Sequence, residues 1–214
     1  MSPLKGPHQG QPILYAGASL EHAKTAMVML HGRGASAQDI LRLVPDLNQP
    51  DFAYIAPQAA RNTWYPHSFL SQIPQNEPGL SSGLRAIADV LDHLAGAGFP
   101  PERIVLLGFS QGACLTLEFI ARHARRYGGI AGLSGGLIGP DGTPRNYTGS
   151  LESTPIFLGC SDVDPHIPKE RVLETTAVLQ KMYGNVTERL YPGMGHTINQ
   201  DEINFVKSMM TAML

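Results

Sequence analysis

Charge is scarce in this sequence of 214 residues, since only 16% of the residues are charged. The 16 basic and 18 acidic side chains leave a formal net charge of -2. A chain with so small an excess of acidic side chains offers no electrostatic reason to bind nucleic acid or an anionic membrane as its main partner. Because 43% of the residues are hydrophobic, the composition also argues against a disordered chain.

Cysteine is nearly absent as well. Cys114 and Cys160 are too few for a disulfide framework or a four-ligand zinc site. We interpret both as small buried thiols, and a disulfide between them is not expected in a cytoplasmic protein. No apolar run reaches the roughly 18 residues of a membrane span, and none near Met1 resembles a signal peptide. These absences predict a cytoplasmic protein without stable membrane insertion.

Seven short apolar runs alternate with helix-like patterns. The inner runs are continuously apolar, as expected for parallel strands that helices cover on both faces. Strands are expected at Ile13–Ala16, Ala26–Leu30, Ala53–Ala56, Ile104–Leu107, Ile130–Leu133, Ile156–Gly159 and Thr187–Tyr191. Helices are expected at Ala37–Leu43, Ser81–Ala95, Gln111–Arg125, Lys169–Tyr183 and Asp201–Met213. We therefore predict a single three-layer α/β domain over residues 1–214, with residues 1–11 as a flexible leader.

The stretch 57–78 fits neither helix nor strand and is rich in aromatic residues. A loop of this length inside a compact domain usually has a function or is disordered, and its aromatic residues favour a function. We interpret Trp64, Tyr65 and Phe69 as a wall of a substrate pocket. Plain core packing is the alternative for Trp64.

The most informative run is Gly108-Phe109-Ser110-Gln111-Gly112, which joins an expected strand to an expected helix. Gly-x-Ser-x-Gly in this context is typical of a nucleophile elbow, a sharp turn that holds the serine above the sheet. Larger side chains at the two glycines would collide in such a turn. The helix N-terminus beside the serine favours negative charge. The alternative is a serine that merely caps the helix.

A serine hydroxyl is a weak nucleophile until a base takes its proton. Of the eight histidines, His196 lies in a glycine-rich loop after the last expected strand. It is the last histidine in the chain, and in this topology the base follows both the serine and the acid. We therefore expect His196 to be the general base, which implies that activity falls at acid pH.

The acid that orients this base should follow the strand Ile156–Gly159, where Asp162 and Asp164 compete. Asp164 is favoured because the following proline holds it in an extended conformation. Asp162, Asp164 and His166 alternate as metal ligands sometimes do. No further ligands at recognisable spacing accompany them, so no metal is expected.

The oxyanion that forms during attack needs preorganised donors. The backbone N–H of Gln111, directly after the serine, is one candidate. The loop after the strand Ala26–Leu30 offers the N–H of Arg33 as the other. We interpret His31 as a brace of this loop. The Arg33 side chain either contacts an anionic substrate group or lies exposed in the turn.

Four motifs occur together and in order: Leu30-His31-Gly32-x-Gly34, Gly108 to Gly112, Asp164-Pro165-x-x-Pro168 and Gly195-His196. They resemble the carboxylesterase/phospholipase family of α/β-hydrolases, which includes acyl-protein thioesterases and bacterial small-ester carboxylesterases. The resemblance implies an α/β-hydrolase fold with a mostly parallel sheet, little or no lid, and no cofactor. It also implies roles for five residues: Ser110 as nucleophile, Asp164 as orienting acid, His196 as base, and Arg33 and Gln111 as oxyanion donors.

Departures from the family pattern bear on the substrate. Arg33-Gly34-Ala35 stands where protein-deacylating members usually carry a Leu-Gly-Asp-type sequence. Residues 62–66 and 76–80 look closer to bacterial branches, including a group linked to hydroquinone resistance. We therefore expect a serine carboxylic-ester hydrolase for small to medium-chain esters.

Several alternatives stay open. The same site would also serve a thioesterase, a lysophospholipase, a lactone hydrolase or a cofactor-free perhydrolase, and a hydrolase fold can also be a non-catalytic binding protein. The expected partner is a small-molecule ester, and a homodimer is left open. His67 and Glu77 are assigned no role.

Overall fold

The computed structural model describes residues 6–214, which surround a seven-stranded sheet in the order β1-β3-β2-β4-β5-β6-β7. Only β1 and β3 pair in antiparallel fashion, and all other neighbours are parallel. The mostly parallel sheet and all seven expected strands are therefore confirmed. The strands are β1 (Ile13–Gly17), β2 (Thr25–Leu30), β3 (Phe52–Pro57), β4 (Ile104–Phe109), β5 (Gly129–Leu133), β6 (Pro155–Ser161) and β7 (Asn185–Tyr191).

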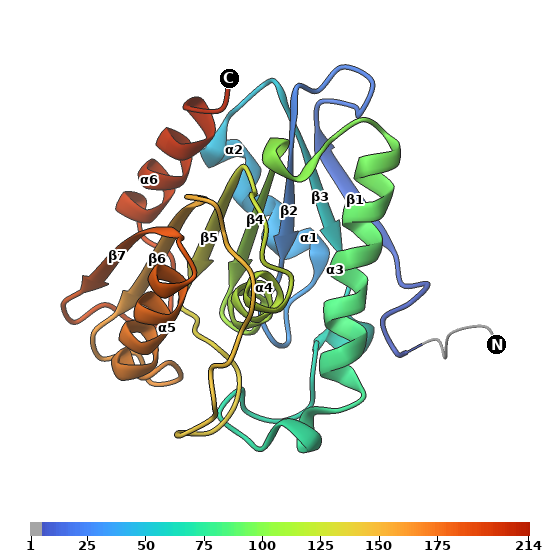
Figure 1. Ribbon diagram of the computed structural model, residues 1–214. Helices are drawn as coiled ribbons and strands as arrows, with labels where there is room; N and C mark the ends of the chain where they lie inside the picture. The colour runs from blue at the N-terminus through green and yellow to red at the C-terminus, as the bar shows by residue number, and fades with distance from the viewer. Residues whose placement is uncertain (1–5) are drawn as a thin grey trace.

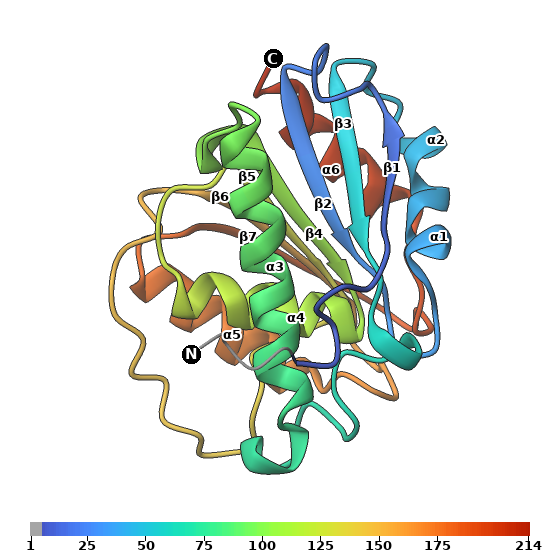
Figure 2. The same ribbon diagram turned by 90° about the vertical axis from the view of Figure 1, so that its right-hand side faces the viewer.

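Helices cover both faces of this sheet. Figures 1 and 2 show α3, α4 and α5 on one side and α1, α2 and α6 on the other, which confirms the three-layer prediction. The short α2 was not expected, and α4 ends before the expected Arg125. The helices are α1 (Ala37–Ile40), α2 (Val44–Leu47), α3 (Gly79–Gly96), α4 (Gln111–Arg122), α5 (Lys169–Lys181) and α6 (Gln200–Thr211).

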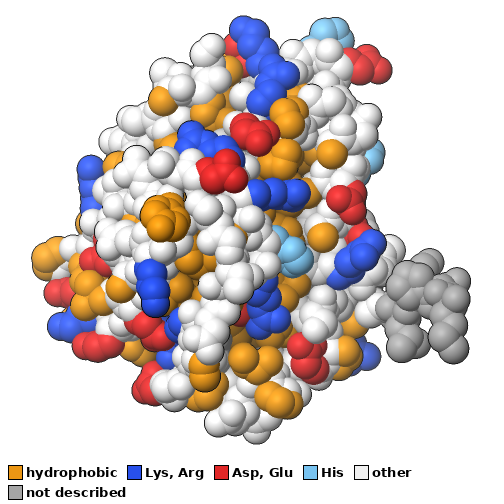
Figure 3. Space-filling model, in the orientation of Figure 1, with side chains coloured by type: hydrophobic (Ala, Val, Ile, Leu, Met, Phe, Trp, Pro, Cys, Tyr) orange, Lys and Arg blue, Asp and Glu red, His pale blue; other side chains and the backbone are white. Residues whose placement is uncertain are grey.

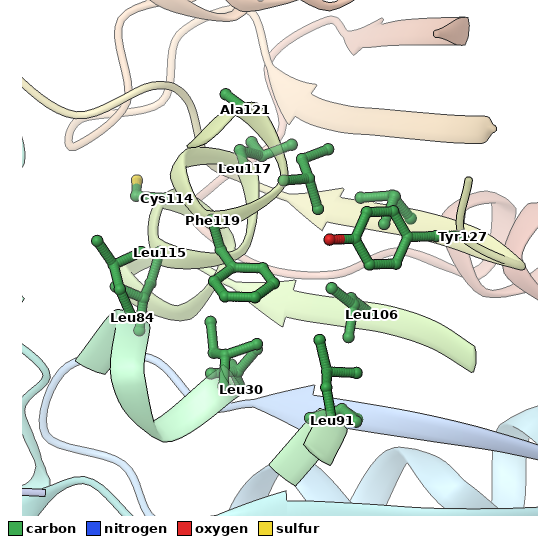
Figure 4. Close-up of a cluster of buried hydrophobic side chains, with 14 of the residues drawn as sticks. Leu30, Leu84, Leu91, Leu106, Cys114, Leu115, Leu117, Phe119, Ala121 and Tyr127 are labelled. Atoms are coloured by element: carbon green, nitrogen blue, oxygen red, sulfur yellow. The ribbon is translucent and has the colours of Figure 1, made fainter. Parts of the chain in front are cut away.

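Each face of the sheet has its own apolar core. One core joins α3, α4 and α5 to the sheet, and Figure 4 shows the part of it in which α3 and α4 pack over β2 and β4. The other core joins α1, α2 and α6 to the opposite face, and Met209 and Met210 of α6 are buried in it. Burial of apolar side chains on both faces explains why the inner strands are continuously apolar.

The first described residues pack against the loop that follows β3. His8 is 5% exposed, and its Nε2 donates to the Trp64 carbonyl at 2.8 Å. Its Nδ1 accepts from the Ala60 N–H at 3.1 Å. The sequence predicts that His8 belongs to a flexible leader of residues 1–11, but its imidazole is buried and pairs two backbone groups of this loop. Residues 1–5 of the expected leader lie outside the described residues.

Charged side chains of both signs are interspersed on the face in Figure 3, as the small net charge leads one to expect. Within residues 6–214, no helix combines the length and the apolar character that crossing a membrane requires.

Candidate active site

The predicted site residues lie at one edge of the sheet. Ser110 directly follows β4, Asp164 follows β6, and His196 follows β7. Arg33 follows β2, which is the neighbour of β4. Because these four strands are parallel, their carboxyl ends share an edge, where open α/β sheets commonly bind ligands.

Ser110 occupies a sharp turn between β4 and α4. Its φ of 55° and ψ of -119° lie outside the regions that side chains other than glycine favour. A Cβ on Gly108 would overlap the Gly112 carbonyl, and one on Gly112 would overlap the Leu30 carbonyl. The two glycines therefore permit the turn in the way that the elbow pattern predicts. Strained backbone of this kind is often found at functional sites.

A continuous chain of hydrogen bonds joins three of the predicted residues. His196 Nε2 lies 2.8 Å from Ser110 Oγ, and its Nδ1 lies 2.7 Å from Asp164 Oδ2. An ionised carboxylate only accepts, so Nδ1 carries the proton and Nε2 accepts from the serine hydroxyl. The arrangement has the geometry in which a histidine takes a proton from serine and a carboxylate fixes the histidine tautomer.

Asp164 is held rigidly. Its side chain is fully buried, and Oδ1 accepts from the His166 N–H at 2.8 Å and from the Ile167 N–H at 3.1 Å. Burial acts to raise the pKa of Asp164, but the hydrogen bonds from His196 and from the two backbone groups outweigh it and lower the pKa. The carboxylate is therefore ionised at neutral pH.

Asp162, the competing aspartate, makes a different contact. Its Oδ1 accepts from the Gly193 N–H at 2.8 Å. Nearby, the Ser161 hydroxyl donates to the Met194 carbonyl. Both bonds tie the end of β6 and the loop after it to the loop that carries His196. Within residues 6–214, no group of three or more His, Cys, Asp or Glu side chains could hold a metal ion.

The loop after β3 contacts both segments that carry the predicted oxyanion donors, the loop after β2 and the start of α4. The Gln111 side chain accepts from the Trp64 N–H at 2.9 Å and donates to the Tyr65 carbonyl at 2.8 Å. The Trp64 indole donates to the His31 carbonyl at 2.9 Å. His31 in turn accepts from the Ala59 N–H through Nε2 at 3.1 Å, which supports its interpretation as a brace.

The Arg33 side chain is exposed, and its guanidinium binds this same loop. It donates to the Pro66 carbonyl at 2.7 Å and to the carbonyl of His67. Its backbone N–H, like that of Gln111, donates to no described protein acceptor. Both N–H groups are therefore available to an oxyanion.

A cavity of about 440 Å³ opens at the serine. Tyr65 and Phe69 line it, whereas Trp64 is completely buried and does not. The predicted wall role of Trp64 is thus replaced by its alternative, core packing. The residues that line the cavity are Arg33, Tyr65, Ser68, Phe69, Ser110, Gln111, Cys114, His166, Ile167 and His196.

Sequence reasoning considered His166 only as a metal ligand. In the structure its ring packs edge-on against His196, with ring centroids 4.8 Å apart and an interplanar angle of 75°. The only sequence signal for this contact was its place two residues after Asp164, within the turn between two prolines. Nothing in the sequence indicated that the Gln111 side chain binds the loop after β3.

The two cysteines are free and buried. Burial raises the pKa of each thiol to about 12. Neither thiol is ionised at neutral pH, so neither competes with Ser110 as a nucleophile.

Comparison with known proteins supplies the context for this geometry. Residues 17–214 match the family model described as phospholipase/carboxylesterase. A crystal structure of a phospholipase/carboxylesterase from Dyadobacter fermentans superposes with a TM-score of 0.92 at 44% identity. The superposition covers 96% of this chain and 98% of that one.

Curated relatives include carboxylesterases and thioesterases. Acyl-protein thioesterase 1 of Saccharomyces cerevisiae is 26% identical over 93% of this chain and 99% of its own length. The probable carboxylesterase SOBER1-like of Arabidopsis thaliana is 26% identical over 64% of this chain and 52% of its own length. This chain thus spans about half the length of such plant relatives.

Proposed function

Because this chain belongs to the phospholipase/carboxylesterase family and has its α/β-hydrolase fold, we propose that it hydrolyses small to medium-chain carboxylic esters through an acyl-enzyme on Ser110. The observation that carries the proposal is the hydrogen-bonded chain from Ser110 through His196 to the buried Asp164. This geometry activates a serine hydroxyl without a metal or a cofactor.

The first half of the reaction forms the acyl-enzyme. Ser110 Oγ attacks the ester carbonyl carbon while its proton passes to His196 Nε2. Asp164 stabilises the resulting imidazolium through its bond to Nδ1. The carbonyl oxygen becomes an oxyanion that the N–H groups of Arg33 and Gln111 stabilise. The tetrahedral intermediate then collapses, and His196 gives its proton to the departing alcohol.

The second half repeats this chemistry with water. His196 takes a proton from a water molecule, and the resulting hydroxide attacks the acyl carbon. When the second tetrahedral intermediate collapses, Ser110 Oγ leaves and recovers the proton from His196. The products are one carboxylic acid and one alcohol, and the free enzyme is restored.

The size of the cavity supports small and medium acyl groups. Its volume of about 440 Å³ lies near the lower end of the range for small-molecule sites. Tyr65 and Phe69 supply apolar walls on the side of the loop after β3. The full-length match to a protein named acyl-protein thioesterase favours thioesters as a second candidate, since they pass through the same acyl-enzyme.

The decisive experiment is hydrolysis of p-nitrophenyl esters with acyl chains of increasing length, by the wild type and by Ser110→Ala. We expect the substitution to lower kcat/KM by about a thousandfold or more, because no other nucleophile can replace the serine. Ser208→Ala, which removes an exposed hydroxyl of α6, is the matched control. Labelling of Ser110 by a fluorophosphonate separates this proposal from a non-catalytic binding protein. Wild-type turnover that survives in Ser110→Ala would contradict it.

The cytoplasmic location and the independence of cofactors remain predictions, and a homodimer stays open. The two free, buried thiols are compatible with a reducing compartment.

A further inference from the structure

Arg171 is a buried cation that the proposed mechanism does not use. It lies in the first turn of α5, and its side chain is only 2% exposed. A guanidinium removed from water must be paired, since an unpaired buried charge is costly. Its Nε pairs with Glu174 at 2.8 Å, and its Nη2 donates to Asp141 at 2.8 Å. Both carboxylates reach solvent, so the buried end of this network is the arginine itself.

The other contacts of Arg171 lead to the wall of the cavity. Its Nη1 donates to the carbonyls of Leu137 at 2.8 Å and Gly139 at 2.6 Å, in the loop after β5 (residues 134–154). The Gly139 N–H donates in turn to the Phe69 carbonyl at 2.7 Å. The Arg171 guanidinium carbon also lies 5.8 Å from the centre of the Phe69 ring, within cation–π range. Arg171 therefore contacts the ring of a cavity-lining residue and, through Gly139, its backbone.

Phe69 has no other polar anchor in the part of the chain that the structure describes. The bond from Gly139 is the only hydrogen bond that Phe69 makes there. The residue lies in the loop after β3, at a point that belongs to no helix or strand, so no regular backbone pairing fixes it. A wall limits the length of a bound chain only where neighbouring side chains hold it in place. For Phe69, Arg171 is such a neighbour.

Arg145 separates this role from general support of the loop after β5. Its Nε pairs with Glu174 at 2.8 Å, and its Nη1 donates to the Ile138 carbonyl at 2.6 Å. It therefore binds the same carboxylate as Arg171 and the same stretch of the loop. Of the two arginines, only Arg171 lies over the Phe69 ring.

We propose that Arg171 is a positioning residue for substrate selection, which holds Phe69 against the cavity and so limits the length of the ester chain that fits. The inference rests on the proposed function and deepens it. Arg171 touches neither the substrate nor the reacting atoms in this role, and it acts through Phe69 alone.

Ester pairs that differ in chain length test this role. p-Nitrophenyl hexanoate and acetate differ in the acyl part, whereas hexyl and ethyl acetate differ in the alcohol part. The ratio of kcat/KM for the longer to the shorter ester is measured for the wild type, Arg171→Gln, Phe69→Leu, the double variant of these two, and Arg145→Gln as the matched control. The fraction of folded enzyme cancels in each ratio, so a loss of stability alone does not change it.

We expect Arg171→Gln to raise the ratio of at least one pair by about threefold or more, because a wall that yields admits the longer chain. Phe69→Leu should raise the same ratio. The effect of Arg171→Gln should be smaller in the double variant than alone, since substitutions that act through one contact are not additive. Arg145→Gln should stay within twofold of the wild type.

Ratios for Arg171→Gln within twofold of the wild type in both pairs overturn the inference. An equal shift in Arg145→Gln, or an undiminished effect in the double variant, overturns it as well. Should Arg171→Gln fail to fold, Arg171→Lys takes its place, since lysine keeps the charge without the planar fork that binds several acceptors at once. Turnover that still requires Ser110 leaves the proposed function standing in each case. A wild type that hydrolyses none of the four esters counts against both.

Discussion

Asp164 and Asp162 stand two residues apart, but their contacts separate their roles. Asp164 accepts from His196, whereas Asp162 accepts from the backbone N–H of Gly193. Asp164→Asn would offer an amide in place of the ionised carboxylate and would favour the wrong histidine tautomer. We expect kcat/KM for p-nitrophenyl acetate to fall about a thousandfold or more.

Asp162→Asn is the control for this substitution, because an amide oxygen still accepts from Gly193. Its activity should stay close to that of the wild type. Equal losses in the two variants would mean that the acid has been assigned to the wrong aspartate.

Asp164 should add nothing to the pH dependence of activity near neutrality. The pKa of Asp164 is lowered, so this carboxylate remains ionised where histidines titrate. Protonated His196 cannot accept the serine proton. We therefore expect kcat/KM to fall on acidification, approaching about tenfold per pH unit on the acid limb. A profile that is flat from pH 5 to 8, measured with an uncharged ester, would contradict the assignment of His196 as base.

At the scale of elements, the turn from β4 to α4 depends on a close approach of the start of α4 to the end of β2. A Cβ on Gly112 would overlap the Leu30 carbonyl, which cannot move without disturbing β2. We expect Gly112→Ala to destabilise the fold by about 2 kcal/mol or more, as overpacking against rigid backbone does. Gly96→Ala is the control, since a Cβ there meets nothing within 4 Å. Urea unfolding curves for the two variants measure the difference, and equal midpoints would refute the argument.

The start of α6 carries a second testable feature. Glu202 caps this helix by accepting the Asn199 N–H at 2.8 Å, but its other carboxyl oxygen is buried and unpaired among the described residues. Burial raises the pKa of Glu202 to about 7. Since the folded state binds the proton more tightly than the unfolded chain, stability should decline as the pH rises from about 4.5 to about 7.

Glu202→Gln keeps a cap acceptor but cannot ionise. We expect the Tm difference between Glu202→Gln and the wild type to increase in favour of the variant by a few degrees from pH 5 to pH 8. About 1 kcal/mol corresponds to about 2–4 °C in a chain of this size. Glu170→Gln, at an exposed position in the first turn of α5, should show no such gain. A Tm difference between Glu202→Gln and the wild type that does not change with pH would exclude this role for Glu202.

The helices and strands also differ in how well the sequence predicts them. The strands can be predicted from the sequence because burial on both faces requires apolar residues at every position. Gly108 and Gly112 predict the turn because glycine has no Cβ that would collide in it. The short α2 was missed because Pro45 looks like a helix breaker, although proline is well tolerated in a first turn, where it lies here. The sequence of residues 57–78 has no periodicity from which its conformation could be predicted. The contacts of Trp64, Gln111 and His8 depend on it, so they could not be predicted.

At the scale of the whole molecule, the candidate site is built from segments far apart in the chain. The segment that carries His8 meets the loop after β3, and that loop meets both α4 and the end of β2. Trp64 lies at the centre of these contacts and is completely buried. We therefore expect the geometry around Ser110 to depend on His8, a residue near the N-terminus that does not line the cavity.

His8→Ala tests this dependence. The substitution would leave the buried Trp64 carbonyl and the half-buried Ala60 N–H without their partner, so we expect a loss of about 2 kcal/mol or more in the free energy of unfolding. It should also lower kcat/KM, because the loop that binds the Gln111 side chain loses its contacts with the N-terminal segment. His22→Ala removes an exposed imidazole from a turn near β2 and should change neither quantity. Urea unfolding and ester hydrolysis of both variants decide the matter. A destabilised His8→Ala with wild-type kcat/KM would mean that Gln111 and His31 hold the loop after β3 without help from the N-terminal segment.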